Sequence, residues 1–219
     1  MLKGSAQEDA TAVWRLDFAA ATTGPAGGQP ATVLKSVGPL GVNLVRASEV
    51  AVLAERVANG DVAADAVEAE VERIKHLPSL YNRWVLVALA GATGACFTQI
   101  SGGDWGSFGI AFVAAAVGQF VRSLLQTRKV AVAPITLFCG ALSAFIASVG
   151  LRLGYSQAEA ATLIASVIYI VPGLPLINGF VDMISHRHLV VGFERIVNAA
   201  FLFLILAIAI AFAHTALAL

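Results

Sequence analysis

Five long apolar stretches fill the chain from Trp84 onward, and they constrain its fold more than any other feature. Most of them approach the length of about 20 residues that a helix needs to cross the hydrocarbon core of a bilayer. The fourth stretch is interrupted by the sequence Val-Pro-Gly-Leu-Pro at positions 171–175. Proline has no backbone N–H, so the interruption frees carbonyl groups that need partners in protein or in a watery cavity. We therefore expect non-helical backbone within a membrane span.

An interrupted membrane helix has two common explanations. Broken helices form the binding sites of many secondary transporters, because their freed backbone groups can bind a substrate or an ion. A proline can also kink a purely structural membrane helix. The interruption at 171–175 thus favours a transport protein and leaves a bent structural helix as the alternative.

The composition agrees with a membrane protein and divides the chain into regions. Hydrophobic residues make up 58% of the chain and charged residues 13%. Residues 1–83 hold eight of the 14 Lys/Arg and ten of the 14 Asp/Glu, which leaves ten charged side chains for the other 136 residues. We predict a flexible leader at 1–30, a cytoplasmic helical region at 31–83 and a five-helix transmembrane domain at 84–219. The predicted fold class is all-α.

The polar region before the spans is predicted to contain a helical hairpin. The leader lacks the continuous apolar core of a signal peptide, and 31–35 is compatible with a short strand. Asn43 is a good N-cap for a helix that ends near Gly60. Asp61 is expected to cap a second helix that ends near His76. The carboxylates of this second helix are interpreted as solvated groups rather than metal ligands.

The five spans can be placed and oriented from the sequence. They are expected at 84–99, 105–121, 130–149, 158–185 and 189–213. Lysine and arginine gather before the first span, after the second and after the fourth, whereas the opposite side carries only Arg152. By the positive-inside rule, the N-terminus is predicted to be cytoplasmic and the C-terminus to lie outside an inner (plasma) membrane.

Polar residues follow the interruption in the fourth span. Asn178 and Asp182 are four residues apart on one face of a short helix, and Arg195 lies early in the fifth span. Ionisable residues within a membrane are functional candidates, because exposing them to lipid is costly. Asp182 could accept a proton or pair with Arg195, and Arg195 could instead bind a substrate carboxylate. The alternative is that both are interfacial side chains that reach toward lipid headgroups. The predicted substrate-pathway residues are Pro172, Gly173, Pro175, Asn178, Asp182 and Arg195.

Other kinds of chemistry find little support in the sequence. We see no nucleophile–base pair, phosphate loop or zinc motif, and therefore expect no enzyme activity, no cofactor and no metal; zero net charge argues against nucleic acid as a partner. His186 and His188 are interpreted as loop residues rather than metal ligands. Gln119 and Arg122 are expected to line a vestibule or simply to mark the end of the second span. Hydroxyls within spans, such as that of Ser143, are expected to bond to their own helix.

Two features point to a membrane partner. Secondary transporters are commonly built from two related bundles, whereas this sequence has five spans and no obvious internal repeat, so we expect a second membrane subunit or a second copy. Gly91 with Ala95, and Gly140 with Ala144, are pairs of small residues that let helices approach closely. A non-transporting subunit that stabilises or regulates a partner transporter is the alternative function.

The residues around the interruption also resemble those of a known family. The sequence at 171–182, with His188, Gly192 and Arg195 after it, is similar to the P-G-x-P-x-x-N-x-x-x-D pattern of the threonine/serine exporter family. The sequence Tyr-Asn-Arg-Trp at 81–84 resembles the end of that family's cytoplasmic region.

This resemblance extends from about Val33 to the C-terminus and implies a secondary exporter of small polar metabolites in the inner membrane. It implies amino acids such as threonine and serine as substrates or, as in split two-subunit relatives, succinate. Full-length family members have a second membrane half, and their cytoplasmic region usually begins earlier. The resemblance therefore implies the N-terminal-half subunit of a split exporter, and the choice between an amino acid and a dicarboxylate stays open.

Overall fold

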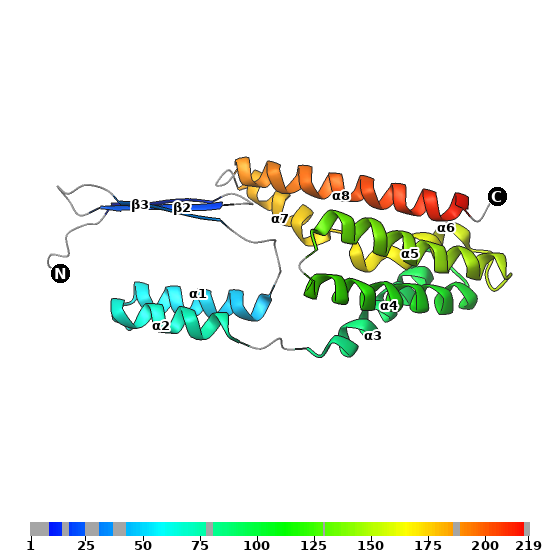
Figure 1. Ribbon diagram of the computed structural model, residues 1–219, viewed down its shortest axis with the longest axis horizontal. Coiled ribbons are helices and arrows are strands. Elements are labelled where there is room, and N and C mark those ends of the chain that lie inside the picture. The colour runs from blue at the N-terminus through cyan, green and yellow to red at the C-terminus, as the bar shows by residue number, and fades with distance from the viewer. Residues whose placement is uncertain are drawn as a thin grey trace. The chain divides into compact units, whose positions relative to one another are not determined.

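The computed structural model (Figure 1) describes residues 9–14, 18–24, 31–36, 43–77, 81–128, 130–185 and 189–216. The chain divides into two compact units, a small one at Leu40–Leu86 and a larger one that contains the remaining strands and helices. The prediction of an all-α membrane protein is confirmed by the helices that dominate the chain, and a small antiparallel sheet is added to them.

The sheet lies near the N-terminus of the chain. Its strands are β1 (Asp9–Trp14), β2 (Phe18–Gly24) and β3 (Ala31–Ser36), in the order β1-β2-β3. Strand β3 agrees with the strand expected at 31–35, whereas β1 and β2 fall where we expected a flexible leader. The alanine- and threonine-rich composition hid these strands, because threonine favours strands but alanine does not. The domain boundaries at 30 and 83 stay predictions.

The small unit is a hairpin of two helices, α1 (Leu44–Ala58) and α2 (Ala64–Lys75). The Asn43 side chain accepts a hydrogen bond from the Arg46 N–H at 3.1 Å, which confirms the predicted N-cap. The expected Asp61 cap is wrong, since α2 begins at Ala64. Gly60 has a φ of 79°, and the Asp61 N–H bonds to the Arg56 carbonyl at 2.9 Å. Asp61 therefore closes the first helix and cannot begin the second.

The larger unit contains four helices that are long and apolar enough to cross a membrane. They are α3 (Arg83–Ile100), α4 (Trp105–Thr127), α5 (Val132–Arg152) and α8 (Leu189–Ala216). A bent pair of helices meets the same criteria together, and counts as a fifth span if both of its arms belong to one crossing. In it, Glu159–Ile170 (α6, Glu159–Val167, and the short 3-10 helix η1, Ile168–Ile170) meets α7 (Gly173–Ile184) at 71°. Four of the predicted spans are thus single helices of a multi-pass membrane protein, and the predicted fourth span is the bent pair, with the interruption at its bend.

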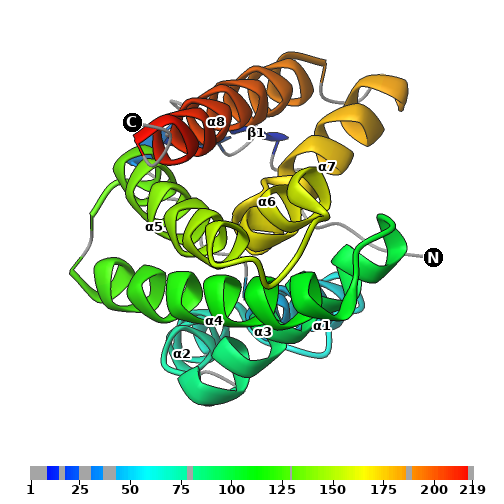
Figure 2. The same cartoon turned by 90° about the vertical axis from the view of Figure 1, so that its right-hand side faces the viewer.

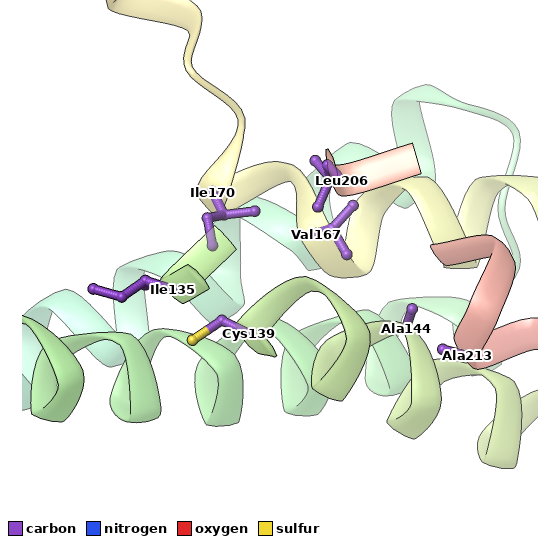
Figure 3. Packing of buried hydrophobic residues seen from close by; sticks show 7 residues of the cluster. All are labelled: Ile135, Cys139, Ala144, Val167, Ile170, Leu206 and Ala213. Carbon is purple, nitrogen blue, oxygen red and sulfur yellow. The ribbon is translucent and has the colours of Figure 1, made fainter. Parts of the chain in front are cut away.

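Helix α5 is the centre of the packing. It contacts α4, α6 and α8, and Figure 2 shows it between α4 and α8. Figure 3 shows part of the buried cluster at this contact, with Ile135 from α5, Val167 from α6 and Leu206 from α8. Lipid provides little hydrophobic driving force between helices, so close packing of small residues carries much of the association.

The small-residue pairs of the sequence lie at helix contacts within the chain. A Cβ on Gly91 would come within 3.0 Å of the Phe112 carbonyl oxygen in α4, and a Cβ on Gly140 within 2.7 Å of the Leu206 side chain in α8. Ala95 and Ala144 are fully buried. These residues therefore pack helices of the same chain, and the partnership that we inferred from them needs other support.

Candidate functional site

The interruption of the fourth span lies between Ile170 and Gly173. Pro172 is buried at the position that precedes α7, and the Gly173 N–H bonds to the Val171 carbonyl at 2.9 Å. Pro175 is the third residue of α7. The N–H groups in the first turn of a helix have no acceptor within the helix, so proline is tolerated at this position. The expectation that both prolines open the backbone is therefore wrong in part, because the break lies at Pro172 and Pro175 starts the next helix.

The break leaves the carbonyl of Tyr169 without its helical hydrogen bond, and Arg122 bonds to this carbonyl instead. In a continuous helix this carbonyl would accept a bond from the N–H of residue 173, which here bonds to Val171 instead. The Arg122 guanidinium of α4 donates to the Tyr169 carbonyl at 3.0 Å. Within the described residues, no carboxylate lies at ion-pairing distance from Arg122. A half-buried guanidinium thus stands at the break with donors left over.

The side chain of Tyr169 joins three helices beside the break. Its hydroxyl lies 3.1 Å from Ser143 Oγ and donates to the Cys139 carbonyl at 3.4 Å, both in α5. The Ser143 hydroxyl donates to the Ala114 carbonyl of α4 at 3.0 Å. A Cβ on Gly118 would lie 2.0 Å from Tyr169 Oη, so only glycine leaves room for the ring at this place.

A second polar group forms where α7 meets α8. Asp182 and Arg195 form an ion pair, with 21% and 30% of their side chains exposed. The two helices approach closely because each has a glycine at the contact. A Cβ on Gly179 would lie 2.9 Å from the Gly192 carbonyl oxygen, and a Cβ on Gly192 would lie 2.8 Å from the Gly179 carbonyl oxygen. Of the alternatives left open by the sequence, the structure contains the Asp182–Arg195 pair.

The predicted pathway residues therefore fall into two groups along α7. Pro172 is buried, and Gly173 and Pro175 are half-buried at the start of the helix. Asn178 is exposed one turn later, and Asp182 lies near the end. Asp182 lies nine positions after Gly173, which is about 14 Å along a helix axis. The sequence placed Asn178 and Asp182 on one short helix, and the structure extends that helix back to Gly173, so Gly173 and Pro175 belong to it as well.

Sequence reasoning missed part of the cluster around Tyr169. Arg122 was considered as a vestibule or span-end residue, and Tyr169 and Gly118 were not considered. Ser143 was expected to bond to its own helix, which is wrong, whereas Thr93 does bond to its own helix at 2.8 Å. An arginine and a tyrosine within apolar spans were the available signal, but their partners depend on which helix faces meet.

Metal binding receives no support from the described part of the chain. No group of three or more His, Cys, Asp or Glu side chains there could hold a metal ion. His186 and His188 lie outside the described residues. Glu70 and Glu72 of α2 pair with Arg73 and Lys75, at 3.0 and 2.6 Å, on the surface of the hairpin.

Comparison with known proteins shows the same family that the residues around the break suggested. The model of the family described as "Putative threonine/serine exporter" matches residues 19–217. The chain is 35% identical to a protein of Klebsiella aerogenes named "Probable succinate transporter subunit YjjP", over 68% of this chain and 57% of that protein. The Escherichia coli protein of the same name is 34% identical, over 63% and 54% of the two chains.

A more distant relative has the other substrate in its name. The "Probable threonine/serine exporter" of Mycobacterium tuberculosis is 24% identical, over 79% of this chain and 32% of its own length. The chain thus spans just over half the length of the first two relatives and about a third of the last. No solved structure matches the chain significantly. From the family match over most of its length, the chain belongs to the threonine/serine exporter family.

Proposed function

We propose that the chain is one half of a secondary exporter of small polar metabolites that carry a carboxylate. The observation that carries this proposal is the broken span with a guanidinium at its break. Arg122 bonds to the freed Tyr169 carbonyl and has further N–H donors in a plane that suits a carboxylate. A merely kinked helix needs no arginine from a neighbouring helix, since water or its own hydroxyls can satisfy the freed carbonyl.

The substrate route follows α7. Pro172 keeps the backbone open at one end, Gly173 and Pro175 begin the helix there, and Arg122 offers the first binding group. Asn178 then presents an exposed amide, and the Asp182–Arg195 pair stands at the other end of the helix. Arg195 can exchange its intramolecular carboxylate for that of a substrate, because the two partners are equivalent in charge and shape.

A partner completes the transporter. Two relatives are named transporter subunits. A second membrane subunit, or alternatively a second copy of the chain, would supply the opposite wall of the route. The uneven distribution of Lys and Arg supports a cytoplasmic N-terminus and a C-terminus outside the inner membrane.

Efflux from cells tests this function. Cells loaded with labelled threonine, serine or succinate should export one of them when they express the chain together with a complementary membrane half. The chain alone should export little. If neither arrangement exports any of the three, the alternative of a non-transporting subunit is favoured. Transport by a purified homo-oligomer in liposomes would overturn the two-subunit arrangement but not the export.

A further inference from the structure

A pocket of about 250 Å³ lies at the end of the membrane helices where α8 ends, opposite the start of α8. It is lined by Ser148, Leu151 and Arg152 from the end of α5, Glu159 from the start of α6 and His214 from the end of α8. Figure 1 shows that α8 ends on the side where α5 passes into α6. The pocket is smaller than the roughly 300–1,000 Å³ that drug-sized ligands occupy, so its size suits a small metabolite.

Ser148 has an unsatisfied hydroxyl at this pocket. Its side chain is 98% buried, and its Oγ has no hydrogen-bond partner among the described residues. The other seven buried Ser and Thr side chains of the described chain all make hydrogen bonds. Leaving a buried hydroxyl unpaired is costly, and a missing ligand or water is a common explanation.

The charged residues of the pocket suit an anionic ligand, which would bind to Arg152 close to the carboxylate of Glu159. Arg152 is exposed, and no described carboxylate pairs with it. His214 Nε2 and Glu159 Oε1 are 3.3 Å apart, so these two residues satisfy each other and join α8 to α6. Arg152 lies one turn after Ser148 on the same helix and therefore on the same face. A guanidinium and an unpaired hydroxyl thus lie one helical turn apart among the residues that line the pocket.

We propose that this pocket is a binding site for a small carboxylate, held by Arg152 and Ser148. Glu159 repels a second carboxylate and attracts an ammonium group, so a ligand with one carboxylate fits better than a dicarboxylate. The position of Arg152 at a helix C-terminus has a simple electrostatic benefit, but that benefit explains neither the pocket nor the unpaired hydroxyl. The site is separate from the proposed route along α7 and does not depend on export.

Binding to the full-length chain in lipid nanodiscs tests the site by calorimetric titration with propionate, L-alanine and succinate. Propionate carries the carboxylate alone, L-alanine adds an ammonium group, and succinate adds a second carboxylate. Arg152→Gln should weaken propionate binding by at least about tenfold, the usual scale for losing a charged hydrogen-bond pair. Arg128→Gln, which removes an exposed arginine just after α4, is the matched control and should bind as the wild type does.

A second variant covers the case in which Arg152→Gln misfolds. Ser148→Ala should weaken propionate binding about threefold to tenfold, yet leave the ligand-free protein as stable or more stable, because it removes an unpaired hydroxyl. Alanine should bind more tightly than succinate. The site is overturned if propionate does not bind the wild type, or binds both pocket variants with wild-type affinity. Tighter binding of succinate than of alanine would contradict the role given to Glu159.

Discussion

At the scale of single residues, the break is held open by contacts from neighbouring helices. Arg122 from α4 bonds to the freed carbonyl, and the Tyr169 ring occupies space that Gly118 leaves empty. Ser143 in α5 bonds to both Tyr169 and the backbone of α4. The proline alone would allow many bent arrangements, and these contacts select one.

Gly118→Ala should destabilise the protein and disturb the break. The new Cβ would lie 2.0 Å from Tyr169 Oη and 2.1 Å from Ser143 Oγ, so the ring has to move. Overpacking of this kind costs about 1–3 kcal/mol. Gly109→Ala in the same helix is the control, since a Cβ there meets nothing within 4 Å. Thermal unfolding in detergent should separate the two variants, and equal midpoints would contradict the packing described here.

Arg122→Gln should reduce export even after correction for any loss of folded protein. The variant loses a charged hydrogen bond, worth about 1.5–3 kcal/mol, and also the proposed carboxylate-binding group. We expect efflux per folded molecule to fall at least about tenfold, a change of about 1.4 kcal/mol in transition-state or binding free energy. Arg128→Gln is the control, because this exposed arginine lies outside the break. Wild-type efflux from Arg122→Gln would contradict a role of Arg122 in substrate binding and would mean that its role is only structural.

At the scale of elements, the helix ends matter as much as the helix bodies. Asp104 caps α4, where its carboxylate accepts bonds from the Ser107 N–H at 2.7 Å and from the Gln157 N–H at 3.2 Å. The loop between α5 and α6 is thereby tied to the start of α4. The backbone N–H of Ser107 is the main cause of a lowered pKa of Asp104, and the Ser156 side chain adds to it.

The lowered pKa of Asp104 gives stability a dependence on acid. Its pKa in the folded protein lies below the ordinary value of 3.8, so its contribution is complete above that pH. The contribution is lost as the pH falls through the folded-state pKa, because the unfolded chain takes up the proton first. Asp104→Asn keeps a capping side chain but should lose this part of the pH dependence.

Thermal midpoints between pH 3 and pH 6 check this prediction. The difference between wild type and Asp104→Asn should shrink as the pH falls toward the lower end. Asp61→Asn is the matched control, because only the backbone N–H of Asp61 takes part in closing α1 and its carboxylate caps neither helix. A difference between wild type and Asp104→Asn that stays constant over this range would show that the carboxylate charge contributes nothing.

Some helices and the break could be predicted from the sequence, whereas other helix ends and contacts could not. Length and apolarity placed the spans, because a bilayer fixes both. The missing N–H of Pro172 placed the break. The start of α2 was missed because Asp61 serves the preceding helix, which is decided by the backbone conformation at Gly60. The contacts of Arg122 and Ser143 were missed because they depend on which faces of separate helices meet.

At the scale of the whole molecule, orientation is the first property to test. The Lys and Arg distribution predicts that a reporter fused before residue 1 is cytoplasmic and one fused after Leu219 lies outside. Five crossings require the two ends to be on opposite sides. Reporters on the same side would mean that the bent pair of α6 and α7 enters and leaves the membrane on one face.

The central claim is that the broken span binds the exported substrate, and efflux per folded molecule tests it most directly. Pro172→Ala with Pro175→Ala should let α6 and α7 join into one helix, since a proline inside a helix costs about 3 kcal/mol or more. Pro134→Ala, which changes a proline in the first turn of α5, is the control. We predict normal insertion of both, wild-type efflux from the control and efflux reduced at least about tenfold, or about 1.4 kcal/mol, in the double variant. Wild-type efflux per folded molecule from the double variant would contradict the account.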